Sequence, residues 1–306
     1  MFGGRTRPHF FAPGRSNMYY LQLAVNGIIA GSMYALFAVG LTMVYGVFRF
    51  INFAHGELIA LGAYGALLFT SPPFSVPLVW AIAPAVACTV CVGLLQDRLV
   101  FQPLRHGSRI SLLIASIGLS YLLRNAIQFG FGSDLLSYDV GLVTGYEWGP
   151  IIITQMQIAM LITTVVFLSF LYWLFTRTML GKALRAVADN MELAGIMGIP
   201  LRRVNLTVWI LASAFAAVGG ILLAVDTSLE PMMGVINLLK AFAAVLLGGP
   251  GNVWGALIGG VLIGLAENLS VAVFSPGYKD FIAFAVILIM LLFRPAGIFS
   301  LKQGMR

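Results

Sequence analysis

The chain has 306 residues, of which 60% are hydrophobic and only 9% are charged, and it carries a formal net charge of +7. Soluble domains contain roughly a quarter charged residues, so this composition excludes a globular protein with a polar surface and indicates a membrane protein. Segments such as residues 282–293 are apolar on every side, which excludes the alternating pattern of a transmembrane β-barrel.

The expected fold is all-α, a polytopic transmembrane helical bundle of about eight or nine spans that includes broken helices, at roughly 20 residues per crossing. Residues 18–306 are expected to form a single transmembrane domain. The apolar segments that predict the spans are residues 19–46, 57–70, 78–100, 110–131, 155–175, 204–225, 235–248, 253–274 and 280–293.

The charges between these segments predict the orientation, because cytoplasmic loops of membrane proteins are enriched in Lys and Arg. The side expected in the cytoplasm receives Arg49, Arg98, Arg105, Arg109, Arg177, Lys182, Arg185, Arg202, Arg203, Arg294, Lys302 and Arg306. The opposite side receives Asp134, Asp139, Glu147, Asp226, Glu230 and Asp280, with Lys279 as a lone loop cation.

The charges at the N-terminus disagree with the number of crossings. Nine crossings place it outside, although residues 1–17 carry Arg5, Arg7 and Arg15. Either residues 39–56 cross as a broken helix, which would return the N-terminus to the cytoplasm, or Met18 is the true start and residues 1–17 are an N-terminal extension. The charge count favours the broken helix.

Residues 49–57, RFINFAHGE, place polar groups between apolar segments. Such groups are costly at membrane depth and usually face a protein interior or an aqueous path, so Asn52, His55 and Glu57 are candidate translocation-pathway residues. Asn52 is a plausible N-cap for a helix that begins near Phe53, whose positive dipole end would favour a carboxylate. The structural alternative is that Asn52 and His55 satisfy backbone groups at a break and that Glu57 pairs with Arg49.

Three further kinds of residue, the cysteines, the histidines and two embedded cations, have simple interpretations. Cys88 and Cys91 lie in an apolar run without further ligands, so we expect two buried thiols that act as small hydrophobes. With three scattered histidines and no H-E-x-x-H, no metal site is expected. Arg124 and Lys240 are expected to lie close enough to the interface for their long side chains to reach water. The alternative is that either cation meets a substrate carboxylate.

The stretch from Gly181 to Pro200, GKALRAVADNMELAGIMGIP, is far longer than a turn between two spans needs. It predicts two short helices separated by glycines, within a cytoplasmic connection over residues 176–203. The spacing places charged residues on one helical face and apolar residues on another, and the mixed charge suits a protein groove better than lipid headgroups. The candidate docking residues are Gly181, Lys182, Arg185, Ala188, Asp189, Glu192, Ala194, Gly195 and Gly198.

A glycine-rich stretch over residues 248–268 predicts close packing between helices, because small residues let backbones approach. The packing or hinge candidates are Gly248, Gly249, Pro250, Gly251 and Gly255. Glu267 and Asn268 lie deep in the same apolar run, where they could line a pathway; Glu267 could equally bond to a neighbouring helix.

Three of these segments resemble one family. GKALRAVADNMELAGIMGI is similar to the cytoplasmic coupling segment of ABC-importer permeases for branched-chain amino acids, residues 40–64 to that family's N-terminal motif, and residues 246–269 to its glycine-rich C-terminal motif. The closing FRPAGIF, residues 293–299, fits as well. The resemblance, closest to the LivH type, runs from about residue 20 to the end and implies a type II ABC importer permease fold. Residues 1–17 lie outside it, which supports treating them as an extension.

The resemblance implies a permease that pairs with a second related permease, two cytoplasmic ATPase subunits and a periplasmic binding protein in the bacterial inner membrane. The chain has no G-x-x-x-x-G-K-[ST], so it is not expected to be an enzyme or to hold a cofactor, and ATP would be bound by the partner subunits. Permeases for urea or short amides have similar motifs and remain an alternative. A self-contained secondary transporter would leave residues 181–200 without a purpose, and no hydrolase motif supports an intramembrane enzyme.

Overall fold

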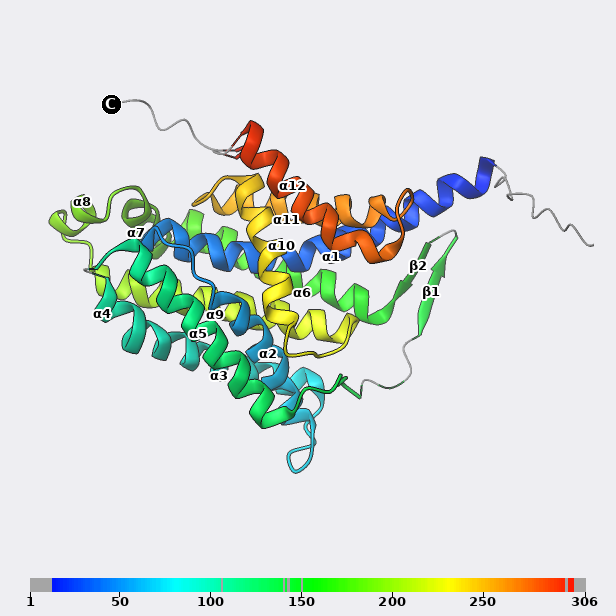
Figure 1. The fold of residues 1–306 in the computed structure, drawn as a ribbon, viewed down its shortest axis with the longest axis horizontal. Helices are drawn as coiled ribbons and strands as arrows, with labels where there is room; N and C mark the ends of the chain where they lie inside the picture. The colour runs from blue at the N-terminus through cyan, green and yellow to red at the C-terminus, as the bar shows by residue number, and fades with distance from the viewer. Residues whose placement is uncertain are drawn as a thin grey trace, which may run out of the picture.

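The computed structural model describes residues 13–105, 107–139, 141, 144–149, 151–294 and 297–299 of the chain. Within these residues, seven helices are long and apolar enough to cross a bilayer. Two more, α2 (His55–Thr70) and α10 (Met233–Gly248), have 16 residues each and are shorter than a full span. The predicted all-α membrane bundle is confirmed (Figure 1).

The remaining helices comprise spans that follow the predicted apolar segments closely and three short helices outside those segments. They are α1 (Pro13–Phe48), α3 (Leu78–Gln96), α4 (Gln102–Leu104), α5 (Arg109–Phe131), α6 (Gln155–Arg177), α7 (Met179–Asp189), α8 (Met191–Ile196), α9 (Leu201–Asp226), α11 (Val253–Ser270) and α12 (Lys279–Phe293). A π-helical turn joins α3 to α4, and an antiparallel hairpin of β1 (Gly145–Trp148) and β2 (Ile151–Thr154) precedes α6.

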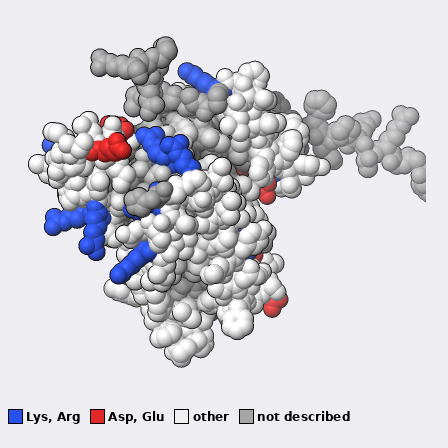
Figure 2. Space-filling view, turned by 60° about the vertical axis from the view of Figure 1, so that its left-hand side comes forward, with Lys and Arg blue, Asp and Glu red and all other residues white. Residues whose placement is uncertain are grey.

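The two ends of the bundle differ in charge. One end, here called the basic end, carries α7, α8 and the turn between α3 and α5, and Figure 2 shows Lys and Arg side chains gathered there. The opposite end, the hairpin end, carries β1 and β2 (Figure 1). Acidic residues from α9, the loop after it and α12 meet at the hairpin end, where Asp226, Glu230 and Asp280 line one cavity. This separation agrees with the predicted orientation; Lys302 and Arg306 lie outside the described residues.

The start of α1 corrects the favoured interpretation of the N-terminus. α1 is one continuous helix up to Phe48, and its first turns lie at the hairpin end, where Gln22 donates a hydrogen bond to the backbone oxygen of Ile152 in β2 (3.0 Å). Residues 39–56 therefore make no additional crossing, and the broken-helix interpretation is wrong. A break does follow α1, over residues 49–54, because Arg49 takes a positive φ of 57° that ends the helix. Residues 1–12 of the predicted extension lie outside the described residues.

α1 and α9 form the centre of the bundle, whereas α12 lies at its edge. The most apolar windows of α1 and α9 are 89% and 83% buried, compared with 6% for the window that includes α12. Helices that are apolar on all sides yet exposed along most of their length are suited to contact lipid or another membrane subunit. The sequence does not distinguish these two groups, because both are equally apolar.

Glycines let α11 lie directly against α1. A Cβ added to Gly264 would overlap the backbone of Gly31, and one added to Gly260 would overlap the backbone of Ala35. The predicted small-residue packing of this stretch is thus explained by backbone contact between two antiparallel helices.

The turn between α10 and α11 contains the predicted break at Gly249, Pro250 and Gly251. Both glycines have positive φ, 98° and 87°, which residues with a Cβ rarely adopt. The next residue, Asn252, caps α11 by accepting a hydrogen bond from the backbone of Gly255. On either side of the turn, the backbones of Gly248 and Gly255 touch, so a side chain on either glycine would overlap the other helix.

A buried ion pair joins α2 to α5. Glu57, with a fully buried side chain, accepts hydrogen bonds from Arg124 (2.7 Å) and from Ser120 (2.9 Å). This pairing corrects two expectations. Glu57 does not pair with Arg49, because the break turns Arg49 toward the basic end, and Arg124 points to a carboxylate inside the protein instead of reaching for water.

The cysteines and Asn52 also differ in detail from the expectation. Cys88 and Cys91 are free thiols that are exposed on α3, because residues three apart share a helical face and theirs faces away from the bundle. Asn52 accepts a hydrogen bond from the backbone of Ala54 (3.1 Å), so it caps the break itself, and α2 begins at His55, two residues later than expected.

We predict that Gly264→Val destabilises the folded chain by about 1–3 kcal/mol or more, because the added carbons overlap the backbone of α1. Thermal unfolding in detergent measures the change. Gly118→Val in α5 is the matched control, since a Cβ there meets nothing within 4 Å. An unfolding temperature that is equally lowered in both variants would contradict the specific contact.

We predict that Arg124→Met, which leaves the Glu57 carboxylate buried without its partner, lowers the free energy of unfolding by about 3–5 kcal/mol. The double variant Glu57→Gln/Arg124→Met removes both charges and should recover much of that loss. The same detergent unfolding assay measures both. A double variant as unstable as Arg124→Met would show that packing, not the pairing of charges, determines stability here.

Candidate functional site

The connection between α6 and α9 folds into two short helices, α7 and α8, as predicted. Thr178 caps α7 by accepting a hydrogen bond from the backbone of Gly181 (3.0 Å), and Asn190 caps α8 by accepting one from Leu193 (3.0 Å). The helices therefore meet at Asn190, and not at the glycines as expected. Gly195 lies inside α8, and Gly198 follows it with a positive φ of 83°.

α7 packs one apolar face against its own chain and leaves its charged residues exposed. Leu184 and Val187 are buried, whereas the predicted charged residues are exposed; these are Lys182, Arg185 and Asp189 in α7 and Glu192 in α8. Gly181 packs so closely on the end of α6 that a Cβ would overlap the backbone of Leu174. Motion of α7 would therefore be transmitted directly to α6.

α8 also presents an apolar surface that the sequence analysis missed. Leu193, Ile196 and Met197 are 56%, 82% and 74% exposed at the basic end. Ala194, in contrast, is buried, and Ala188 and Gly195 are half-buried. The spacing of 193, 196 and 197 places these three side chains on one side of a helical turn, and this spacing could have indicated the surface. Exposed apolar groups beside charges are typical of a protein interface.

Arg49 connects α7 with the break after α1. Its guanidinium donates a hydrogen bond to the backbone oxygen of Ala188, near the C-terminal end of α7, at 2.6 Å. Cations are stabilised at this end of a helix by the unsatisfied carbonyl groups and the helix dipole. The break begins at Arg49 and ends before His55, the first residue of α2. The Nε2 atom of His55 lies 3.3 Å from the backbone oxygen of Phe37 in α1.

The pathway candidates fall into two separate groups. Asn52, His55 and Glu57 are fully buried around the start of α2, where Glu57 is held by α5. Glu267 and Asn268 lie on α11 instead, at a cavity that Glu57 does not line. The structure thus brings together the members of each group but not the two groups.

The second group surrounds a cavity of about 440 Å³, here called the hairpin-end cavity. Its lining comes from α1, α6, α9, α10, α11, α12 and the loop between α9 and α10. The polar and charged lining residues are Asn26, Tyr34, Gln157, Asp226, Thr227, Ser228, Glu230, Asn237, Lys240, Glu267, Asn268, Lys279 and Asp280. The apolar part of the lining includes Ile29, Met33, Leu223, Met233 and Ile236.

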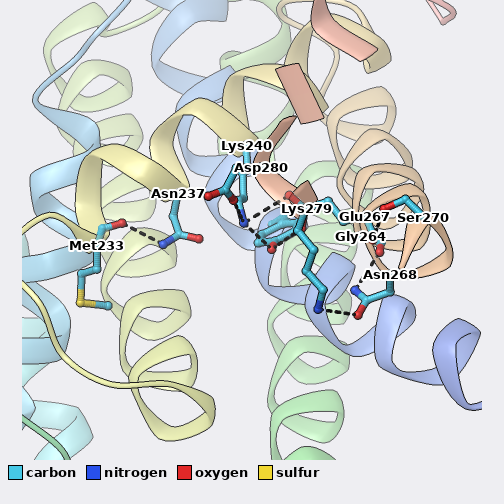
Figure 3. Close-up of polar contacts among 10 residues, drawn as sticks. Met233, Asn237, Lys240, Gly264, Glu267, Asn268, Ser270, Lys279 and Asp280 are labelled. Atoms are coloured by element: carbon cyan, nitrogen blue, oxygen red, sulfur yellow. Dashed lines mark hydrogen bonds and ion pairs between the residues drawn. The ribbon is translucent and has the colours of Figure 1, made fainter. Parts of the chain in front are cut away.

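Lys240 is the centre of the charge network in this cavity (Figure 3). Its ammonium nitrogen lies 3.2 Å from Glu267 and 2.9 Å from Asp280. The Tyr34 hydroxyl donates a hydrogen bond to the other oxygen of Glu267 (2.7 Å) and accepts one from Lys240. The expectation that Lys240 extends toward water is therefore wrong, because two carboxylates hold it inside the protein.

Asn268, next to Glu267 on α11, makes separate polar contacts in the same cavity. It donates a hydrogen bond to the backbone of Gly264 and accepts one from Lys279 (3.3 Å; Figure 3). Glu267 thus bonds to α1 and α10, which agrees with the alternative of a bond to a neighbouring helix. It also lines the cavity, and a role in a translocation pathway stays a prediction. Within the described residues, no cluster of His, Cys, Asp and Glu could hold a metal ion.

Comparisons with known proteins assign this architecture to a family. The family model described as "Branched-chain amino acid transport system / permease component" matches residues 23–291. The high-affinity branched-chain amino acid transport system permease protein BraD of Pseudomonas aeruginosa is 37% identical over 293 residues, covering 92% of this chain and 95% of BraD.

Two more relatives show how far the similarity extends. The corresponding permease protein LivH of Escherichia coli is 34% identical over 298 residues, covering 92% of this chain and 96% of LivH. The galactofuranose transporter permease protein YtfT of Escherichia coli is 25% identical over 284 residues, covering 89% of this chain and 79% of YtfT. On the family match and these identities, the chain belongs to the family of branched-chain amino acid transport system permease components.

Proposed function

We propose that this chain is a permease subunit of an ATP-driven importer for branched-chain, apolar amino acids, and that it works in the cell inner membrane. In this proposal it pairs with a second related permease, two cytoplasmic ATPase subunits and a periplasmic binding protein. The observation that carries the proposal is the pair of short helices at the basic end, whose charged and apolar groups are exposed while their other side packs on the spans.

The exposed surface of α7 and α8 has the composition of a docking element. An amphipathic helix that enters a protein groove uses apolar anchors surrounded by charges that select the partner. Ile196 and Met197 supply the anchors, and Arg185 and Glu192 supply charges of both signs. ATP would be bound by the partner, because Gly181 and Lys182 are followed by Ala183 and lack the upstream glycine of a P-loop.

The mechanism we propose is alternating access. Closure of the ATPase pair would move α7 and α8, and three contacts would carry this motion into the spans. Gly181 presses on the end of α6, α8 is followed directly by α9, and Arg49 links α7 to the break between α1 and α2. The first two links run through the backbone, whereas the third depends on the Arg49 side chain.

Amino acids are the proposed cargo because BraD and LivH are named for branched-chain amino acid transport and align with nearly the whole chain. YtfT, named for galactofuranose, is a more distant relative. The direct test is uptake of L-leucine into vesicles that contain the complete complex and ATP. Uptake that does not depend on ATP would favour a secondary transporter instead.

We predict that reversing charges on the exposed face, in the double variant Arg185→Glu/Glu192→Arg, lowers ATP-dependent leucine uptake by about tenfold or more, because like charges would then oppose each other at the docking surface. The amount of protein in the membrane should not change, since both side chains are exposed. Replacing Gly195 with Leu should act in the same direction by crowding Leu201, which lies 3.3 Å from a Cβ at that position.

Arg109→Glu is the matched control for these variants, because Arg109 is an exposed cation outside α7 and α8 at the same end of the bundle. Its uptake should stay close to that of the wild type. If the double variant transports as well as this control does, α7 and α8 are not the docking element.

We predict that Arg49→Met lowers the amount of leucine imported per ATP hydrolysed several-fold, while ATP hydrolysis itself continues. A hydrogen bond from a charged donor contributes about 1.5–3 kcal/mol, and its loss would separate α7 from the break after α1. Arg49→Lys keeps a cation at the end of α7 and should retain part of the coupling. Unchanged uptake per ATP in Arg49→Met would show that α6 and α9 transmit the motion without this contact.

A further inference from the structure

We propose that the hairpin-end cavity binds an amino acid as a zwitterion during its passage through this chain. In this assignment Glu267 and Asp280 face the ammonium group of the cargo, and Lys240 faces its carboxylate. The proposal rests on the function proposed above, because it names the place in this permease where the imported amino acid is recognised.

The size and composition of the cavity suit a small amphipathic ligand. Its volume of about 440 Å³ lies within the range of small-molecule sites, roughly 300–1,000 Å³. Four carboxylates and two ammonium groups line it, together with an apolar wall that includes Ile29, Met33 and Leu223. An apolar amino acid has the matching parts, which are two opposite charges next to each other and one hydrophobic side chain.

The arrangement of charges provides the recognition. Without cargo, the ammonium group of Lys240 lies between Glu267 and Asp280, where it occupies the position that a cargo ammonium group would take. An incoming zwitterion can insert between them, so that its ammonium group replaces that of Lys240 and its carboxylate pairs with the displaced Lys240. Positive and negative groups would then alternate, and the buried charges of Lys240 and Glu267 would not be left unpaired.

The contacts of Glu267 favour replacement of the Lys240 ammonium group by that of the cargo. It is 1% exposed, and one of its oxygens is fixed by the Tyr34 hydroxyl. The other oxygen, Oε1, borders Lys240 at 3.2 Å but forms no hydrogen bond within the described part of the chain. A buried carboxylate oxygen without a hydrogen bond is costly, so a second ammonium donor at this position would be stabilised.

The pairing of charges in the cavity also predicts which kinds of cargo the site selects. A neutral cargo such as urea could not replace Lys240 between two carboxylates, and a 2-oxo acid would bring a negative charge to a cavity that already has an excess of them. A site built to pair with a charged group discriminates strongly against analogues that lack it, because the protein groups are then left unpaired.

The test measures L-leucine binding to the purified permease–ATPase complex in nanodiscs without the binding protein, so that only the membrane complex can select the ligand. Binding is followed as the increase in unfolding temperature with leucine concentration. We expect half-saturating leucine to rise about tenfold or more in Glu267→Gln and in Lys240→Met, as for the loss of one charged contact. 3-Methylbutylamine and 4-methyl-2-oxopentanoate, which each lack one charge of leucine, should bind at least about tenfold more weakly than leucine.

Asp134→Asn is the control, because it removes one exposed carboxylate from the hairpin end that does not line the cavity. Asp280→Asn is a second test variant in case the variants of the more buried residues fail to fold, since the Asp280 side chain is 55% exposed. Unaltered leucine binding in Asp280→Asn and Glu267→Gln, or equal binding of the 2-oxo acid, would overturn the assignment.

Uptake of leucine by the complete wild-type complex, measured in parallel, separates this proposal from the function on which it rests. Normal uptake without any leucine-dependent stabilisation of the nanodisc complex would contradict the cavity assignment alone. Absence of ATP-dependent leucine uptake would contradict the proposed function.

Discussion

Backbone contact between α1 and α11 determines where the other parts of this molecule lie. Because Gly31 and Gly264 lack side chains, the two helices touch along their main chains, and α10 folds back onto α11 through the contact of Gly248 with Gly255. α1, α10 and α11 thereby become one tightly packed unit. Tyr34, Lys240 and Glu267, one from each of these helices, meet only because the backbones approach so closely. A single bulky residue at the crossing would therefore affect both stability and the charge network.

Much of this fold could be predicted from the sequence, because its main signals are local. The apolar segments, the break at Gly249–Gly251 and the amphipathic pattern of residues 181–200 each depend on neighbouring residues. The partners of buried charges could not be predicted in the same way. Glu57 and Arg124 are 67 residues apart, and the sequence states only that a charge within an apolar segment needs a partner. Arg49 is the cation nearest to Glu57 along the chain, but a positive φ at that residue ends α1 and directs its side chain to Ala188.

The errors for Lys240 and for the cysteines have a related cause. A lysine near the membrane interface can reach water, and this is the usual outcome when no carboxylate is close. Here α12 brings Asp280 to within 2.9 Å of Lys240, a contact set by the packing of three helices. Cys88 and Cys91 were expected to be buried because they are apolar, but hydropathy cannot distinguish a face toward the bundle from a face toward lipid. The junction of α7 and α8 at Asn190 was more accessible to prediction, since Asn is a preferred N-cap residue.

The two ends of the bundle use charge in physically different ways. At the basic end the charges of α7 and α8 are exposed, so water and salt screen them, and they remain free to pair with a partner surface. At the hairpin end Lys240 and Glu267 are largely removed from water, where an unpaired charge is expensive and every change of partner must be balanced by another. A motion begun at the basic end can therefore be driven from outside the chain. A change at the hairpin-end cavity requires a ligand whose own charges satisfy the groups that it separates.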